Sequence, residues 1–371
     1  MITKKTFLLF FGCVILFSCK NSKTIPIIDL DRIEQSTNLD ITDILKDITA
    51  VQISSDFVLS VNDRVYVTSK YLIIYHNRGA SLDLFSRDGK HIRKLAERGN
   101  GPGEFNRIQY FFVDEEESIL YYNEQGWPRT RLYRIDISSG KAFEPLQIDF
   151  TYLMPKYMNG KLFGLPSHIL LQPTDGSSAS IDAGEYPDSS VVAVSISLPS
   201  GEMEKYRGQH KYSFLILGSS ITSYYDEISL FNLGYSDTLF TLKDKKLSPL
   251  CILHLSKKVT SNEDTGRSGC EIISAYNNGI VLSKINIKPT NRDFFALYDR
   301  KGNIKKIDNT LVMGAKINLT DSKGPFYPSY LLPISCGKFG YMLVEHDVLK
   351  NVSKDFDSNN DNPIIIVGEL K

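Results

Sequence analysis

Short runs of β-branched and aromatic residues recur along the chain, and each run is bounded by Asn, Asp, Gly or Ser. The eight clearest runs cover residues 64–68, 71–76, 81–85, 92–95, 108–113, 119–122, 132–136 and 142–146. Brief apolar runs between polar turns predict β-strands, because strands are short and turn residues end them. Only residues 42–46 have a pattern that favours a helical turn. The chain is therefore predicted to be all-β.

A strand, a polar turn and a second strand recur five times. The segments are LDLFSRDGKHIRKL, RLYRIDISSGKAFEPL, VAVSISLPSGEMEKY, TLFTLKDKKLSPL and FALYDRKGNIKKI. Four of the turns contain a glycine, at Gly89, Gly140, Gly201 and Gly302, with intervals of 51, 61 and 101 residues. The last interval is about two units long, and the turn at residues 243–246 lies inside it. A repeat of about 50 residues built from strands is typical of β-propeller blades.

A sixth unit is predicted from residues 330–345 and the final strand at 363–370. This unit lacks an outer strand, which must come from the N-terminal part of the chain, either residues 25–30 or residues 48–53. Closure of this kind leaves no free sheet edge around the ring. We therefore predict that residues 25–371 form a six-bladed β-propeller of four-stranded antiparallel blades, with the ring closed by N- and C-terminal strands.

The start of the chain has the pattern of an export signal. Lys4 and Lys5 precede an apolar run at residues 7–17 that is too short to span a bilayer. The next stretch, Leu16-Phe17-Ser18-Cys19, resembles a bacterial lipobox. This resemblance implies that residues 1–18 are a lipoprotein signal peptide and that Cys19 is lipidated. An ordinary signal peptide that contains a cysteine is the alternative.

Residues 19–24 would then be a lipidated tether, and the lipid anchor would be the protein's contact with the membrane. Lys20 follows the cysteine, which resembles the sorting pattern of outer-membrane lipoproteins, and the absence of an acidic cluster resembles those that face the periplasm. Without residues 1–18 the chain has 41 basic and 43 acidic side chains. A nearly neutral chain argues against nucleic acid as a partner.

The cysteines do not form a metal-binding pattern, since no CxxC or Cys/His spacing occurs. Cys251 and Cys270 are predicted to be small core residues of strands, with a disulfide between them as the alternative. Asp355, Asp357, Asn359 and Asp361 have an oxygen-rich spacing that suits calcium, but an EF-hand loop also requires a glycine and a glutamate that are missing here. A solvated turn is the preferred interpretation, and no cofactor is expected.

One stretch carries a family resemblance. Residues 85–124, FSRDGKHIRKLAERGNGPGEFNRIQYFFVDEEESILYYNE, resemble an NHL-type repeat. The piece RGNGPGE at residues 98–104 is similar to a signature of the six-bladed β-propeller lipoproteins of Bacteroides-type bacteria. The segments YSDTLFTLKDKKLSP and DNPIIIVGELK also resemble that family, so the likeness covers nearly the whole mature chain. It implies an architecture but no catalytic residues.

The glycine-rich piece could also be a phosphate-binding loop. Such a loop ends in Gly-Lys-Ser/Thr at the start of a helix, whereas Glu104, Phe105 and a strand follow here. We therefore expect Gly99, Gly101 and Gly103 to supply positive φ angles in a link between blades. Arg98 and Glu104 are expected to brace neighbouring blades.

Loops that join blades share one face of a propeller with the loops between second and third strands, so we expect candidate ligand-binding residues there. They are Arg78, Arg98, Asn100, Glu104, Trp127, Arg129, Arg131, Arg207 and His210. Trp127 could stack on a sugar or anchor a partner, or it could simply hold its loop down. The arginines could attract anionic ligands, or they could be solvated. Residues 166–190 are either a lid or, as their polar composition favours, disordered.

Three functions remain open. The first is a lipid-anchored binding or scaffolding module for a glycan, a peptide or an envelope protein. The second is a propeller-type enzyme, such as a hydrolase, a lyase or a metal-dependent lactonase, with its site at the channel mouth. This one is less favoured because no HExxH or GxSxG motif occurs, and catalytic residues stay unknown. The third is a purely structural envelope protein, which predicts a plugged channel.

The side chains around the channel should distinguish these functions. Acidic, histidine or asparagine clusters with pKa values pushed apart would favour an enzyme. A site lined by Tyr, Phe and Arg without paired carboxylates would favour binding.

Overall fold

The computed structural model describes the greater part of the chain. The described residues are 25–29, 39–76, 81–101, 103–124, 131–148, 152–166, 191–207, 220–224, 227–231, 238–243, 246–254, 268–276, 279–286, 292–299, 301–308, 317–318, 334–345, 357 and 360–371. Within these ranges no helix has the length and apolar character needed to cross a membrane. The predicted signal peptide, Cys19 and nearly all of the 166–190 insertion lie outside them.

The first three sheets are meanders of four consecutive antiparallel strands. The first contains β4 (Arg64–Val67), β5 (Tyr71–His76), β6 (Ser81–Ser86) and β7 (His91–Glu97). The second contains β8 (Ile108–Asp114), β9 (Ile119–Glu124), β10 (Arg131–Asp136) and β11 (Ala142–Gln147). The third contains β12 (Tyr152–Met158), β13 (Lys161–Pro166), β14 (Val191–Ser197) and β15 (Met203–Arg207). All eight strands expected between residues 64 and 146 are confirmed.

Two of the other three sheets, the fourth and the sixth, add a strand from the N-terminal part. The fourth contains β16 (Ser220–Tyr224), β17 (Glu227–Phe231), β18 (Thr238–Lys243) and β19 (Lys246–His254), and β1 (Ile27–Asp29) joins β19 in parallel. The fifth contains β20 (Ser268–Tyr276), β21 (Gly279–Asn286), β22 (Arg292–Tyr298) and β23 (Ile304–Asp308). The sixth contains β25 (Ile334–Cys336), β26 (Phe339–Val344), β27 (Ile364–Leu370) and β3 (Leu45–Val51). A short parallel pair, β2 (Leu39–Asp40) with β24 (Ile317–Asn318), and helix α2 (Ile41–Ile44) complete the described elements.

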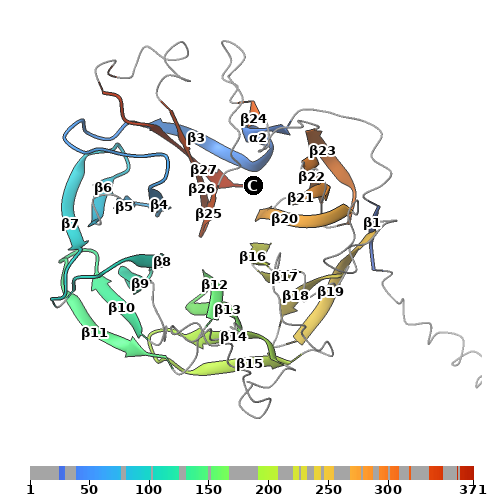
Figure 1. Cartoon of the computed structure of the whole chain (residues 1–371), viewed down its shortest axis with the longest axis horizontal. Helices are drawn as coiled ribbons and strands as arrows, with labels where there is room; N and C mark the ends of the chain where they lie inside the picture. Colours follow the sequence, from blue (N-terminus) through green and yellow to red (C-terminus); the bar gives the residue numbers. More distant parts are fainter. Residues whose placement is uncertain are drawn as a thin grey trace, which may run out of the picture.

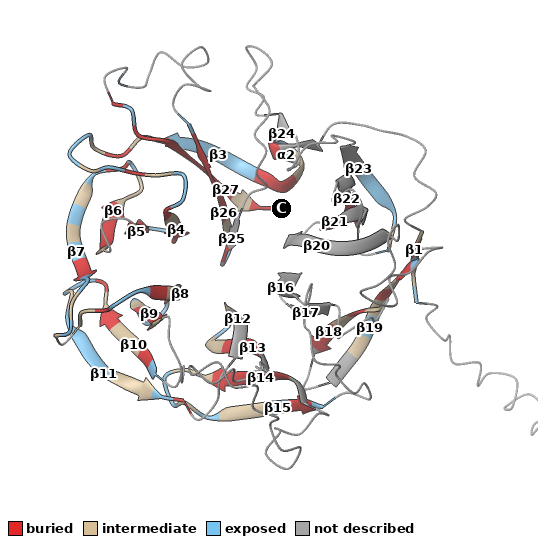
Figure 2. Cartoon of the chain, viewed as in Figure 1, coloured by how far each residue is buried: buried red, intermediate tan, exposed pale blue. Residues whose placement is uncertain are grey.

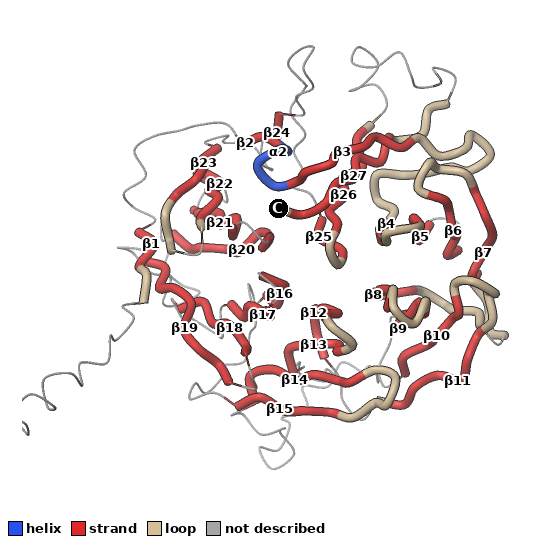
Figure 3. Tube along the Cα trace, turned by 180° about the vertical axis from the view of Figure 1, so that it is seen from behind, coloured by secondary structure: helices blue, strands red, loops and turns tan. Residues whose placement is uncertain are grey.

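The sheets are arranged around a common centre, with the first strand of each sheet nearest to it (Figure 1). Contacts link these inner strands in sequence order, from β4 to β8, β12, β16, β20 and β25, and β26 of the last sheet contacts β4 of the first. The view from behind has the same order (Figure 3). Among the strands whose burial is described, β5, β6, β9, β26 and β27 are mostly buried, whereas much of β7, β11 and β3 is exposed (Figure 2). The chain is therefore an all-β protein with a propeller-like arrangement of sheets.

Strands from the N-terminal and C-terminal parts of the chain pair in the sixth sheet. β3 pairs antiparallel with β27, with Val51 opposite Ile365 and Leu45 opposite Leu370. Of the two N-terminal segments considered for this position, the later one supplies the strand, and residues 27–29 pair with β19 instead. The expected helical turn is α2, just before β3.

The turn glycines inferred from the repeat occupy the left-handed region, where a side chain is strained. Gly89, Gly140, Gly201 and Gly302 have φ values of 89°, 76°, 79° and 83°. In the fourth sheet, Lys243 pairs with Lys246, so the turn without glycine is also in its predicted place. Cys251 is a buried free thiol, as expected for a core residue.

The glycine-rich link at residues 98–104 differs from its prediction in one respect. Of its three glycines, only Gly103 has a positive φ, at 81°. Gly99 and Gly101 leave room for the Glu104 carboxylate, which accepts a hydrogen bond from the Gly101 N–H at 2.6 Å. A Cβ on Gly99 would lie 1.9 Å from Glu104 Oε2. The link therefore surrounds the carboxylate of its own Glu104. This bond is strong, because the acceptor of the backbone N–H is charged.

The described hydrogen bonds of the Arg98 and Glu104 side chains are made within this link and to the residues next to it. The Arg98 Nε donates to the Asn106 carbonyl at 3.2 Å, and the Gly99 N–H donates to the Phe105 carbonyl at 3.0 Å. The two side chains thus hold the entry to β8, and the predicted bracing between blades is not among their described contacts.

Phe85→Ala should lower the free energy of unfolding by about 3–5 kcal/mol, because Phe85 is fully buried and its ring packs edge-on against Phe57 and His91. Denaturant melts measure this loss. Phe143→Ala is the matched control, since Phe143 is 38% exposed on β11, and it should cost under about 1 kcal/mol. Equal losses in the two variants would contradict the placement of Phe85 in the core.

Gly99→Ala and Glu104→Ala should each cost about 1.5–3 kcal/mol, the worth of a hydrogen bond to a charged group. Both changes remove the same interaction, because the new methyl group would displace the Glu104 carboxylate from the link. The double variant should therefore be little worse than either single variant in denaturant melts. Fully additive losses would show that Gly99 is needed for another reason.

Candidate functional site

The structure describes five of the nine ligand-binding candidates proposed from the sequence. Arg98, Asn100 and Glu104 share the glycine-rich link, Arg131 begins β10, and Arg207 ends β15. The other four lie outside the described residues, and they are Arg78, Trp127, Arg129 and His210. None of the five described candidates lines the cavity described below.

The calcium candidate is only partly described. Asp355 and Asn359 lie outside the described residues, and Asp357 and Asp361 are exposed. In the described part of the chain, no group of three or more His, Cys, Asp or Glu side chains is arranged to hold a metal ion.

The neighbouring amides of this segment have a structural use. The Asn362 side chain accepts from the Leu59 N–H at 2.8 Å and donates to the Phe57 carbonyl at 2.6 Å. The Asn360 amide donates to the Ile53 carbonyl at 2.7 Å. These bonds fasten the stretch that leads from β3 to β4.

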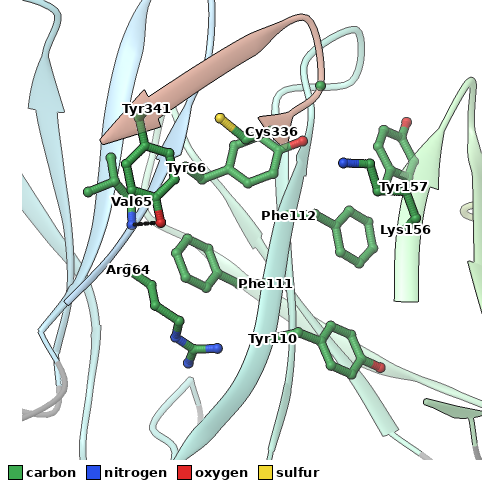
Figure 4. Close-up of a pocket in the computed structure, with 11 residues that line it drawn as sticks. Arg64, Val65, Tyr66, Tyr110, Phe111, Phe112, Lys156, Tyr157, Cys336 and Tyr341 are labelled. Carbon is green, nitrogen blue, oxygen red and sulfur yellow. Dashed lines mark hydrogen bonds between the residues drawn. The ribbon is translucent and has the colours of Figure 1, made fainter. Parts of the chain in front are cut away.

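A cavity of about 180 Å³ lies between the inner strands of four sheets (Figure 4). Its wall is mostly aromatic, and the first, second, third and sixth sheets all contribute to it. The lining residues are Arg64, Val65, Tyr66, Tyr110, Phe111, Phe112, Lys156, Tyr157, Cys336, Gly337 and Tyr341. A cavity near the centre, built from separate sheets, is a plausible place for a ligand in this architecture.

Arg64 joins the first sheet to the second at one side of the cavity. Its Nη2 donates to the Ile108 carbonyl at 2.6 Å and its Nη1 donates to the Gln109 carbonyl, both on β8. The guanidinium also lies over the Tyr75 ring at 4.7 Å and the Phe111 ring at 5.6 Å. Burial lowers the pKa of Arg64, but an arginine stays protonated at any physiological pH.

The backbone of β4 is held by side chains of the sixth sheet. The Val65 N–H donates to the Tyr341 hydroxyl at 3.1 Å, and the Val67 N–H donates to the Cys336 sulfur at 3.4 Å. Burial raises the pKa of Tyr341 and that of Cys336 to about 12. Both groups are therefore neutral at neutral pH, and the Cys336 thiol is a poor nucleophile there.

Lys156 and Tyr157, both on β12, line the opposite side of the cavity. Burial lowers the pKa of Lys156, while the nearby Cys336 opposes this change. Burial and a hydrogen bond to Asp114 raise the pKa of Tyr157, whose ring stacks on Phe112 at 4.9 Å. Arg64 and Lys156 are the basic side chains of the cavity, and its described lining contains no carboxylate.

A second polar cluster lies within the first sheet and does not line the cavity. The Asp83 carboxylate is 3.0 Å from His91 Nε2 and 3.8 Å from His76 Nε2, and His76 Nδ1 is 3.4 Å from Asp63. The Phe57 ring covers both imidazoles, with centroids 4.2 Å from His91 and 6.3 Å from His76. This cluster joins three strands and the segment before β4, so it has a structural role.

Two charged residues were a signal for the cavity in the sequence. Arg64 and Lys156 lie in strands that begin a sheet, and each is followed by apolar or aromatic residues. A charge in an inner strand must face either a partner or an opening at the centre. The candidates chosen from loops instead followed the general tendency of sites to lie there.

Solved structures with a similar arrangement have low sequence identity to this chain. A protein described as exported, from Bacteroides fragilis, is 13% identical, with a TM-score of 0.59 over 93% of this chain and 99% of that chain. A DUF4221 family member from Bacteroides vulgatus is 11% identical, with a TM-score of 0.49 over 88% of this chain and 97% of that chain. A streptogramin B lyase is 9% identical, with a TM-score of 0.42 over 87% and 98%. The first of these structures, at 13% identity, supports the fold alone.

The sequence comparisons give the family. A search of curated proteins finds no match. The family model described as a domain of unknown function, DUF4934, matches residues 25–369. Because this match spans nearly the whole chain, the protein belongs to the DUF4934 family.

Proposed function

We propose that this protein is a lipid-anchored envelope β-propeller that binds a ligand in its central cavity. The observation that carries the proposal is the make-up of that cavity, which has an aromatic wall, two basic side chains and no carboxylate among its lining residues. Such a lining suits recognition, because aromatic faces and hydrogen-bond donors can bind a ligand without catalysing a reaction. Glycans, peptides and envelope proteins are the classes of ligand considered.

In this proposal the six sheets are six blades of one closed ring, similar to NHL-type propellers. The succession of contacts between inner strands, together with the contact between β26 and β4, supports this count. The pairing of β3 with β27 supports closure by strands from both ends of the chain. The propeller would comprise residues 25–371.

Export and anchoring rest on the sequence. Residues 1–18 would be the signal peptide, Cys19 the lipidated residue and residues 19–24 the tether. The protein would then be an outer-membrane lipoprotein that faces the periplasm. The loop residues Arg98, Asn100, Glu104, Arg131 and Arg207, with Trp127, could form a second surface for a larger partner, and nucleic acid is not expected.

A propeller-type enzyme is the alternative function, and one observation favours it. Burial lowers the pKa of Lys156, which increases the fraction of free amine at neutral pH and thus its nucleophilicity. A hydrolase or lyase that relies on paired carboxylates finds less support, because no carboxylate lines the described cavity. Binding is the simpler function for this set of side chains.

Thermal melting of residues 20–371 against glycans, short peptides, small organic acids and divalent ions tests the binding proposal. A ligand that binds only the folded state at 100 times its Kd stabilises it by about 2.7 kcal/mol and raises Tm. Tyr110→Ala, in the cavity, should remove the shift. Tyr71→Ala is the matched control, because Tyr71 is a partly buried tyrosine of β5 that does not line the cavity.

Two other results would change the proposal. A Tm shift that survives Tyr110→Ala and is lost in Trp127→Ala would place recognition on the loops. No shift with any ligand, together with co-purification of another envelope protein, would favour a scaffold.

A further inference from the structure

An apolar group is exposed on the rim of the molecule, where the fourth and fifth sheets meet. Of the eight large apolar side chains that are exposed in the described part of the chain, three lie here, and we call them the rim patch. They are Ile25, Ile27 and Ile304, which are 39%, 64% and 42% exposed. Single exposed apolar residues are common, but a group of them marks a surface that meets a partner.

The backbone holds the two parts of the rim patch together. β1 pairs in parallel with β19 and lies on the outer rim between β19 and β23 (Figures 1 and 3). A Cβ on Gly302 would lie 3.2 Å from the Cβ of Pro26 and 3.3 Å from the Cγ1 of Ile28, so the turn before β23 touches β1. Side chains alternate along a strand, and the buried Ile28 therefore faces the sheets while Ile27 points away from them.

The charges beside the rim patch suit a surface with anionic groups. Lys301 and Lys305 are exposed in and just after the turn, whereas the carboxylates of Asp29 and Asp299 are half-buried. Asp299 Oδ1 accepts hydrogen bonds from the N–H groups of Lys301 and Asn303 at 2.8 Å and 2.9 Å. This carboxylate is thus used within the turn, while the lysines extend from it. Aliphatic side chains flanked by lysines are typical of surfaces that rest on a lipid bilayer.

The chain before β1 determines which surface lies nearby. Residues 19–24 separate Cys19 from Ile25, and six residues reach at most about 20 Å even when fully extended. A domain of about 350 residues is about 50 Å across, which is more than twice this reach. With a lipid on Cys19, the bilayer must therefore lie on the side of the molecule that carries the rim patch.

We propose that the rim patch rests on the bilayer that holds the lipid anchor, with its isoleucines at the boundary between headgroups and acyl chains and Lys301 among the headgroups. This inference rests on the proposed lipid anchor and adds an orientation to it. The lipid retains the protein at the membrane, and the patch sets which part of the ring faces it. The fourth and fifth sheets would face the bilayer, and the first and second sheets would lie on the far side (Figure 1).

The first experiment measures contact with lipid by tryptophan fluorescence. The lipidated protein is placed in vesicles of phosphatidylethanolamine and phosphatidylglycerol with brominated acyl chains, which quench tryptophan at short range. Trp127→Phe removes the only native tryptophan, so that Ile27→Trp, Ile304→Trp or Phe143→Trp then supplies a single probe. Fluorescence from the first two probes should fall by about half, because both would lie at the acyl-chain boundary.

Phe143→Trp is the matched control in this experiment. Phe143 is 38% exposed, as much as the patch residues, but it lies on β11 of the second sheet. Its fluorescence should not change. Equal quenching of all three probes, or none at Ile27→Trp and Ile304→Trp, would overturn the proposal.

The second experiment separates affinity of the patch from mere proximity. About 20 Gly and Ser residues inserted after residue 24 would form a flexible tether that no longer confines the rim to the membrane. Quenching at Ile304→Trp should persist in this protein, and it should weaken when Lys301→Glu is added. Lys141→Glu, an exposed lysine of the second sheet, is the control and should have no effect. A fall of the quenching to the level of Phe143→Trp would show that the patch has no affinity for lipid, and the proposal would be wrong.

This proposal and the proposed function fail in different ways. Mass spectrometry of the mature protein determines whether Cys19 carries a lipid. If it carries none, the anchor and the orientation are both wrong, and binding in the central cavity is unaffected. If the lipid is present but neither patch probe is quenched, the anchor stands and the orientation is wrong.

Discussion

The inner strand of each sheet has one edge with no neighbouring strand, and its backbone donors and acceptors need other partners. In β4 the partners come from the adjoining sheets. The Val65 and Val67 N–H groups bind Tyr341 and Cys336 of the sixth sheet, and Arg64 reaches two carbonyls of β8 in the second. Because buried backbone groups are costly when unpaired, these few bonds fix how closely the three sheets approach. The rest of the arrangement depends on that spacing.

The cavity results from the same bonds between sheets. Side chains that connect sheets across a gap keep the inner strands from pairing directly, and the space between them is filled by rings rather than by backbone. Tyr66, Tyr110 and Phe111 line this space together with two basic residues. Polar bonds to the backbone hold Tyr341 and Arg64 in fixed positions, so the fold itself fixes this part of the cavity wall.

The architecture could be predicted from the sequence to a large extent, because it follows from local rules. Period-2 runs located the strands, and the positive φ of Gly89 and Gly302 follows from tight turns. Gly99 was interpreted by the same rule, but its cause is the Glu104 side chain, a contact that no local pattern reveals. The cavity was also missed, since Arg64, Lys156 and Tyr341 come from three sheets and meet only after folding. Loop candidates such as Trp127 remain predictions.

The pairing of β3 with β27 affects when the sixth sheet can form. β3 (residues 45–51) precedes β27 (residues 364–370) by most of the chain, so their sheet is incomplete until β27 has been synthesised. Contacts between residues so distant in sequence form slowly, because a long loop must close first. During that delay β3 is an unpaired strand that other chains can capture. A protein built this way therefore depends on β27 to end the period in which it can misassemble.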